Sequence, residues 1–179
     1  MQIDYERTVD DLIQFNLFHT DHSPTIQRQL LWWRGLTALL VILLPLGPSY
    51  LMTQEPSPIA YIIGILGGVV AFFVFPPISR TSNINQWKKI IAEGNNKAIL
   101  GRHILTLSEA GIHAKSPGSE SDLEWSTIQK VLQSKSHIFL YISAVNALVI
   151  PKKAFPTEQS QQSFLDFVLS KTKTGEVSR

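Results

Sequence analysis

The sequence predicts an α+β membrane protein, in which a two-helix transmembrane hairpin is followed by a small antiparallel β-domain capped by a C-terminal helix. Three observations predict this class. Two long apolar runs, 30–52 and 58–78, are separated by a short polar linker, apolar and polar residues alternate from Leu100 onward, and an amphipathic segment follows that alternation. A chain of 179 residues has room for this hairpin and one further domain of about 100 residues.

Each apolar run is long enough to cross a bilayer as a helix. A hydrocarbon core about 30 Å thick needs roughly 20 mostly apolar residues. The second run contains no charged residue, and the first carries Arg34 close to its start. A long cationic side chain at that position can reach the headgroups while Trp32 and Trp33 lie at the interface. A cleaved signal peptide is the alternative, and it is disfavoured because an acidic amphipathic segment precedes the first run.

Positive charge around the hairpin predicts its orientation. The linker 53–57 holds no Lys or Arg, whereas five basic residues flank the outer ends of the two runs. These are Arg28, Arg34, Arg80, Lys88 and Lys89. Positively charged segments remain on the cytoplasmic side, so we expect a multi-pass protein of the plasma (inner) membrane with both termini in the cytoplasm.

Small and helix-breaking residues are spaced along the hairpin. Ala60, Gly64 and Gly68 recur every four residues, and such a face lets another helix approach closely. The nearest partner is the first span, and the sequence leaves a homo-oligomer through the same face open. We expect Pro45 to Pro48 to kink or end the first helix and Pro76–Pro77 to close the second span.

Residues 1–29 are predicted to form a cytoplasmic arm made of a strand and an amphipathic helix. Ile3, Tyr5 and Arg7 alternate with polar residues, as in a strand, and Thr8 then has the position of a helix N-cap. The arm contains two Lys or Arg against five Asp or Glu, whereas residues 80–179 contain thirteen against eight. We therefore expect the arm to dock on the C-terminal domain, with Ile3 and Tyr5 extending an edge of its sheet.

Helical periodicity over 79–97 predicts a juxtamembrane helix that stops at Gly94–Asn96. The β-domain is expected at 98–172, with a final helix to about Lys171 and a flexible tail at 173–179. The six expected strands are approximately 101–107, 112–116, 119–125, 128–134, 138–143 and 147–150.

Six strands and one helix give the outline of a pleckstrin-homology-like (PH-like) barrel or sandwich. The chain resembles YcxB-like membrane proteins in four motifs, which are LSEAGI at 107–112, WSTI at 125–128 with Val131, IFLY at 138–141 and IPKKAF at 150–155. This resemblance implies two N-terminal membrane helices followed by a PH-like domain. It implies no catalytic activity.

Most motif residues have a structural interpretation. We expect Gly111 to supply a positive φ in a turn, and Trp125 and Ile128 to pack inside the domain. Pro151 should end a strand, and Phe155 should anchor the helix that follows.

Chemical motifs are scarce in this sequence. Cysteine is absent, and no phosphate-binding Gly-rich loop, nucleophile elbow or HExxH zinc motif occurs. The segment 19–22, His-Thr-Asp-His, lacks a third and fourth ligand at a recognisable metal spacing. We expect no catalytic residue, no cofactor, no metal site and no nucleic-acid partner, so the protein is predicted not to be an enzyme.

The lipid bilayer is one expected partner of the protein. Two candidate functions remain for its cytoplasmic domain. The first is binding of an unidentified protein or peptide by the PH-like domain. The alternative is contact with anionic lipid headgroups through a basic patch. The candidate residues of that patch are Lys152, Lys153, Lys88, Lys89, Arg102 and Lys115.

Overall fold

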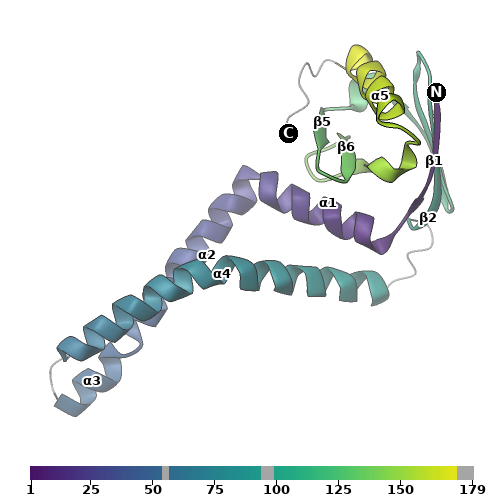
Figure 1. The fold of residues 1–179 in the computed structure, drawn as a ribbon. Coiled ribbons are helices and arrows are strands. Elements are labelled where there is room, and N and C mark those ends of the chain that lie inside the picture. Colours follow the sequence, from purple (N-terminus) through teal and green to yellow (C-terminus); the bar gives the residue numbers. More distant parts are fainter. Residues whose placement is uncertain (54–56, 94–98, 173–179) are drawn as a thin grey trace. The chain divides into compact units, whose positions relative to one another are not determined.

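The computed structural model describes residues 1–53, 57–93 and 99–172. Figure 1 follows the chain through its helices and strands. The chain divides into two compact units, one made of residues 1–19 with 87–179 and the other of residues 20–86. The first unit is therefore discontinuous in sequence, because the chain leaves it to form the helical unit and then returns. The expected linker residues 54–56, the Gly94–Asn96 stop and the tail 173–179 lie outside the described residues.

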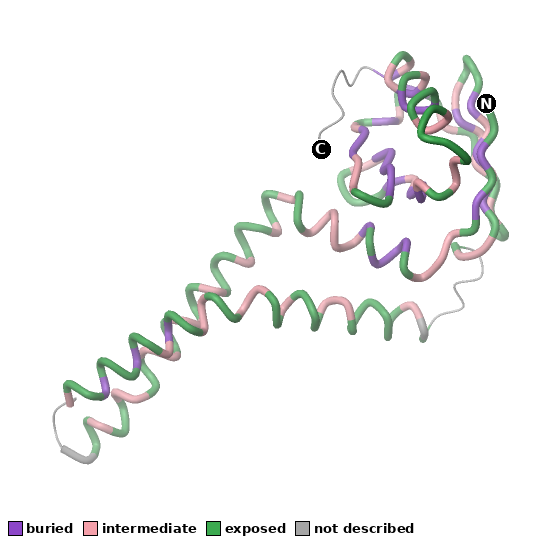
Figure 2. The backbone as a smooth tube through the Cα atoms, viewed as in Figure 1, coloured by how far each residue is buried: buried purple, intermediate pink, exposed green. Residues whose placement is uncertain are grey.

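The helical unit consists of α2 (Pro24–Leu43), α3 (Leu46–Thr53) and most of α4 (Pro58–Glu93). Two helical stretches, 24–51 and 58–91, are long and apolar enough to cross a membrane. The interruption between α2 and α3 confirms the break predicted around Pro45. Figure 2 shows that most of this unit is exposed, as expected for helices whose apolar side chains face lipid.

The prediction that Pro76–Pro77 ends the second helix is wrong. Helix α4 continues through both prolines to Glu93, so the expected juxtamembrane helix is its C-terminal part. Proline has a φ angle that suits a helix, so each ring removes an N–H donor without forcing the chain to turn. The hydroxyls of Ser79 and Thr81 donate to the carbonyls of Pro76 and Pro77, both at 3.0 Å, which supports the following turn.

The predicted small-residue face of α4 lies against α2. A Cβ added to Gly64 would lie 2.4 Å from the backbone oxygen of Ile42, and one added to Gly68 would lie 3.0 Å from that of Ala38. Ala60, one turn earlier, is buried. The two helices therefore approach so closely that only small side chains fit on this face of α4.

The folded unit contains two antiparallel sheets. Sheet A has the order β1-β2-β3-β4 and sheet B the order β5-β6-β7. Sheet A comprises β1 (Gln2–Arg7), β2 (Gly101–Leu107), β3 (Gly111–Ser116) and β4 (Ser119–Glu124). Sheet B comprises β5 (Lys130–Gln133), β6 (His137–Tyr141) and β7 (Ala147–Pro151). All six expected strands are present, and the N-terminal strand is the seventh.

The pairing of β1 with β2 confirms that the arm extends the sheet. Ile3 lies opposite Leu105 and Tyr5 opposite His103, so this edge joins segments about a hundred residues apart in the sequence. The expected barrel is not closed among the described residues, because no strand of sheet A pairs with a strand of sheet B there. A short 3-10 helix (Trp125–Thr127) connects the sheets, and it includes Trp125, which we expected at the end of a strand.

Strand β6 is buried on both faces and therefore lies between two cores. Ile138 and Leu140 belong to the main core, together with residues of sheet A and of helix α5 (Glu158–Lys171). Phe139 and Tyr141 point to the other face, where they meet Phe15 of helix α1 (Val9–His22). The arm thus covers an apolar sheet face that would otherwise be exposed to water.

The motif residues lie mostly as predicted. Trp125 and Ile128 are buried in the main core, Pro151 is the last residue of β7, and the ring of Phe155 lies 5.2 Å from that of Phe164 in α5. The prediction for Gly111 is wrong.

The glycine that has a positive φ, 97°, is Gly101. Gly111 is needed for a different reason, because a Cβ there would lie 2.3 Å from the backbone oxygen of Leu123 on β4.

Candidate functional site

A cavity of about 260 Å³ opens between one end of sheet A and the turn that joins β6 to β7. Its polar lining residues are Tyr5, Arg7, His103, Lys115, Ser116, Ser119, Ser121 and Asn146. Its apolar lining residues are Ile99, Leu105, Ala114, Ile142, Ala147 and Leu148. The cavity lies wholly within the folded unit, and we take it as the candidate site.

Strand alternation explains how polar groups reach the inner face of sheet A. Side chains two residues apart share a face, so Arg7 lies on the same side of β1 as the core residues Ile3 and Tyr5. On β4, Ser119 and Ser121 share the face of Leu123 in the same way. The inner face therefore changes from apolar to polar along the strands, and the polar end lines the cavity.

Arg7 is the dominant charge of the site. Its Nε atom is buried and makes no hydrogen bond, and no ion pair to its guanidinium is present within the described part of the chain. Burial lowers the pKa of Arg7, and the interactions with Tyr5 and Asp11 oppose that shift only in part. A half-buried guanidinium without an ion pair carries a desolvation cost that Tyr5 and Asp11 repay only in part.

His103 lies close to Arg7 and Tyr5. Its ring stacks on Tyr5 with 5.7 Å between centroids, and its Nε2 lies 3.2 Å from the carbonyl oxygen of Ile99. Burial and the positive charge of Arg7 lower the pKa of His103. With Nε2 donating to Ile99, Nδ1 is the unprotonated nitrogen, and burial also raises the pKa of the Tyr5 hydroxyl.

The remaining polar groups supply further donors. Ser116 donates to the backbone oxygen of Ser119 at 3.1 Å, whereas no hydrogen bond of the Ser119 or Ser121 hydroxyl occurs within the described residues. Lys115 is among the lining residues, but its Nζ lies 3.3 Å from Glu120 on the outer face of sheet A. The lining that the structure describes contains no carboxylate.

The six residues of the predicted basic patch do not form a single cluster of this kind. Only Lys115 lines the cavity. Arg102 is on the outer face of sheet A, where its Nε lies 3.0 Å and 3.1 Å from the two carboxylate oxygens of Asp4. Lys152 and Lys153 lie in a 3-10 helix after β7, and Lys88 and Lys89 are exposed on α4.

The outer face of β4 carries a row of acids at alternate positions. Glu120, Asp122 and Glu124 are exposed, and β4 is the last strand of its sheet. His113 on β3 bridges two of these acids, at 2.7 Å from Asp122 and 3.0 Å from Glu120. Hydrogen bonds to Asp122 and then Glu120 raise the pKa of His113.

A buried contact between a histidine and a carboxylate fixes helix α1 to sheet B. The Nε2 atom of His137 lies 2.9 Å from Oδ1 of Asp11, and both side chains are almost fully buried. The other carboxylate oxygen of Asp11 accepts hydrogen bonds from the backbone N–H and the hydroxyl of Thr8, at 2.7 and 2.8 Å. The hydroxyl oxygen of Thr8 also accepts a hydrogen bond from the backbone N–H of Asp11 at 3.3 Å, which confirms Thr8 as the N-cap of α1. The contact with His137 is a tertiary addition to this cap.

The segment His19 to His22 does not converge on one point. His19 packs against Phe15 and Tyr141, whereas Asp21 pairs with Arg80 at 3.2 Å. The described residues contain no group of three or more His, Cys, Asp or Glu side chains arranged to hold a metal ion.

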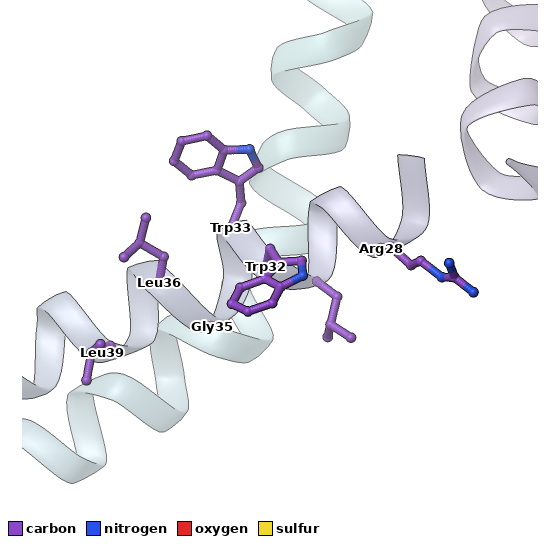
Figure 3. Close-up of a pocket in the computed structure, with 7 residues that line it drawn as sticks. Arg28, Trp32, Trp33, Gly35, Leu36 and Leu39 are labelled. Carbon is purple, nitrogen blue, oxygen red and sulfur yellow. The ribbon is translucent and has the colours of Figure 1, made fainter. Parts of the chain in front are cut away.

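A second depression, of about 520 Å³, lies along α2 (Figure 3). Trp32 and Trp33 project in different directions, and Arg28 extends away from both rings (Figure 3). The described lining comes from this one helix, and Trp32 is 81% exposed. A shallow apolar groove on a single exposed helix is not evidence of a specific ligand.

Sequence reasoning missed Arg7 and the two serines of β4 as site residues. The signal was present, because a charged residue that shares a strand face with Ile3 and Tyr5 must point inward. Its importance depends on the pairing of β1 with β2, which no local pattern specifies.

The fold and site define an α+β protein with two candidate membrane helices, followed by antiparallel sheets and a C-terminal helix. Residues 107–168 match the model of the family described as YcxB-like protein, from the end of β2 into α5. The chain therefore contains a YcxB-like domain, as its motifs predicted. No curated protein and no solved structure matched the chain.

Proposed function

We propose that this chain is a non-enzymatic integral membrane protein that presents a cytoplasmic PH-like domain to a protein or peptide partner. The YcxB-like domain and the two candidate membrane helices support this assignment. Four strands, then three strands and a C-terminal helix, agree with a PH-like outline. In this arrangement the membrane hairpin is inserted between the first and second strands of the domain.

The observation that carries the proposal is the free edge of β4. A strand that ends its sheet presents unpaired backbone groups to which an extended peptide can add. The acids Glu120, Asp122 and Glu124 project from one face of this edge. Opposite charges pair across neighbouring strands, so the partner we propose is an extended segment with Lys or Arg at alternate positions.

Charge reversal on β4 tests this function. The full chain, in nanodiscs of neutral lipid, should bind a synthetic peptide with Lys at alternate positions. The double variant Asp122→Lys with Glu124→Lys should weaken binding by about tenfold or more, since each cross-strand charge pair contributes roughly 0.2–1 kcal/mol and like charges reverse its sign. Glu158→Lys, on an exposed acid of α5, is the matched control. Equal affinity of the β4 variant and this control for the peptide would reject the β4 edge as the peptide-binding site.

The orientation is tested by labelling of introduced cysteines. The chain has no native cysteine, so a cysteine at Gln54, which lies outside the described residues, and one at Ser170 in α5 can be compared directly. An impermeant thiol reagent applied to intact cells should label position 54 and leave position 170 unlabelled until the cells are opened. Labelling of position 170 in intact cells contradicts a cytoplasmic domain.

The second candidate function is contact with anionic headgroups. Lys88, Lys89, Lys152 and Lys153 make no ion pair within the described residues, which leaves their charge available. Each such cation near an anionic surface contributes about 1 kcal/mol. Lys152→Glu with Lys153→Glu should lower binding of the reconstituted chain to anionic vesicles without lowering its thermal stability. Lys135→Glu, at an exposed turn, is the control.

A further inference from the structure

We infer that the cavity between the two sheets is a binding site for a phosphate monoester group, with Arg7 as its principal ligand-binding residue. This site is separate from the β4 edge, because the cavity is lined by the inner face of sheet A whereas the acid row projects from the outer face. The two proposals can therefore fail independently.

Charge is the first argument for an anion. Arg7 has a buried Nε without a hydrogen bond, and no carboxylate is among the described lining residues. A fold keeps an unpaired, half-buried guanidinium only at a cost in stability, and an anionic ligand removes that cost. Arg102 shows the contrasting case, since it pairs with Asp4 in the open on the other face of the sheet.

The number and kind of donors favour phosphate over carboxylate. The guanidinium offers a planar fork, and the hydroxyls of Ser119 and Ser121 are free of hydrogen bonds within the described residues. A phosphate monoester presents three terminal oxygens to such a set, whereas a carboxylate presents two.

The apolar part of the cavity specifies the rest of the ligand. Leu105, Ala114 and Leu148 line it, so the cavity accepts carbon groups as well as the charged head. Its volume of about 260 Å³ is below the range of roughly 300–1,000 Å³ typical of drug-sized ligands. A small phosphorylated molecule fits this description, and so does the headgroup of a phosphorylated lipid.

An exposed apolar residue next to the cavity allows a soluble phosphorylated molecule to be distinguished from the headgroup of a phosphorylated lipid. Val145, in the turn between β6 and β7, is 70% exposed and precedes the lining residue Asn146. A lipid ligand would place this turn against the bilayer, where Val145 inserts favourably. Val145→Asp should then weaken binding to the lipid and leave binding of a soluble phosphate ester unchanged.

The test uses the full chain in nanodiscs of neutral phosphatidylcholine, because β1 and β2 of the site lie on opposite sides of the membrane hairpin in the sequence. Titration calorimetry with inorganic phosphate and with glycerol 3-phosphate measures binding of soluble phosphates. Binding of the same nanodiscs to vesicles that contain phosphatidic acid measures recognition of a phosphorylated lipid. We expect saturable binding in at least one of these two experiments. Arg7→Gln should weaken it by about tenfold or more, since charged hydrogen bonds are lost. Arg102→Gln, with the same loss of charge on the outer face, should bind as the unmodified chain does.

His103 gives a readout that a structural role for Arg7 would not produce. Arg7 lowers the pKa of His103 in the free protein, so an anion bound to Arg7 should raise that pKa, as measured by the NMR titration of the imidazole. Ser121→Ala and Arg7→Lys provide milder changes if Arg7→Gln unfolds. Three results would each overturn the inference. They are no saturable binding in either experiment, equal affinities of Arg7→Gln and Arg102→Gln, and an unchanged titration of His103.

Discussion

Replacement of Asp11 by Ala should release helix α1 from sheet B. The carboxylate of Asp11 lies 2.9 Å from Nε2 of His137 and 2.7 Å from the backbone nitrogen of Thr8. The side chains of Asp11 and His137 are only 5% and 6% exposed. The substitution therefore removes a buried pair and a helix cap in one step, and it leaves His137 buried without its partner.

The expected loss is about 3 kcal/mol, the upper end of what hydrogen bonds to a charged group contribute. The N-cap contributes about 1 kcal/mol, and this is not simply added because both effects use the same carboxylate. Asp11→Asn retains an oxygen for the cap and should cost about 1–3 kcal/mol. Asp10→Asn is the matched control, because Asp10 is exposed in the same helical turn and contributes at most about 1 kcal/mol through the helix dipole.

Amide hydrogen exchange of the full chain in nanodiscs measures this effect. A loss of about 3 kcal/mol in the free energy of opening accelerates exchange by roughly two orders of magnitude. The acceleration should appear at the amides of α1 and be small in the Asp10→Asn control. Exchange of Asp11→Ala within about threefold of that control would refute the reasoning, since about 1.4 kcal/mol corresponds to a factor of ten.

The contact between Asp11 and His137 predicts that the protection of α1 depends on pH. Burial acts to raise the pKa of Asp11, but hydrogen bonds from His137 and Thr8 outweigh it, so the pKa lies below its ordinary value. A carboxyl group with a lowered pKa stabilises the folded state above its unfolded pKa of about 3.9, and this contribution is lost as the pH falls through the folded pKa. Protection of α1 through Asp11 should therefore hold at neutral pH and decline below about pH 4. Asp11→Asn should remove that decline.

Two glycines allow further predictions. Gly111→Ala places a Cβ 2.3 Å from the backbone oxygen of Leu123, so it should lower the stability of the β3–β4 pair by about 1–3 kcal/mol, measured as faster amide exchange in those strands. Gly64→Leu should separate α2 from α4, because even a Cβ at this position lies 2.4 Å from the oxygen of Ile42; the separation is measured between spin labels on the two helices. Gly35→Leu is the control, since nothing lies within 4 Å of its added Cβ.

Local sequence patterns predicted much of the fold. Periodicity and turn residues between 101 and 151 placed all six strands of that region, because antiparallel neighbours joined by short turns are specified by nearby residues. The capping position of Thr8 and the break near Pro45 were equally local. An error occurred at Pro76–Pro77, where the helix continues because proline removes a backbone donor without ending this helix.

The sequence by itself determined the two apolar helices, the alternating strands and the inward side of β1, because side-chain periodicity and helix length are properties of adjacent residues. Only the tertiary structure decided that β1 pairs with β2 across the inserted hairpin, that Asp11 meets His137, and that Arg7 faces a cavity. These contacts join residues about a hundred positions apart. Their formation depends on the packing of whole sheet faces, and no local spacing encodes it.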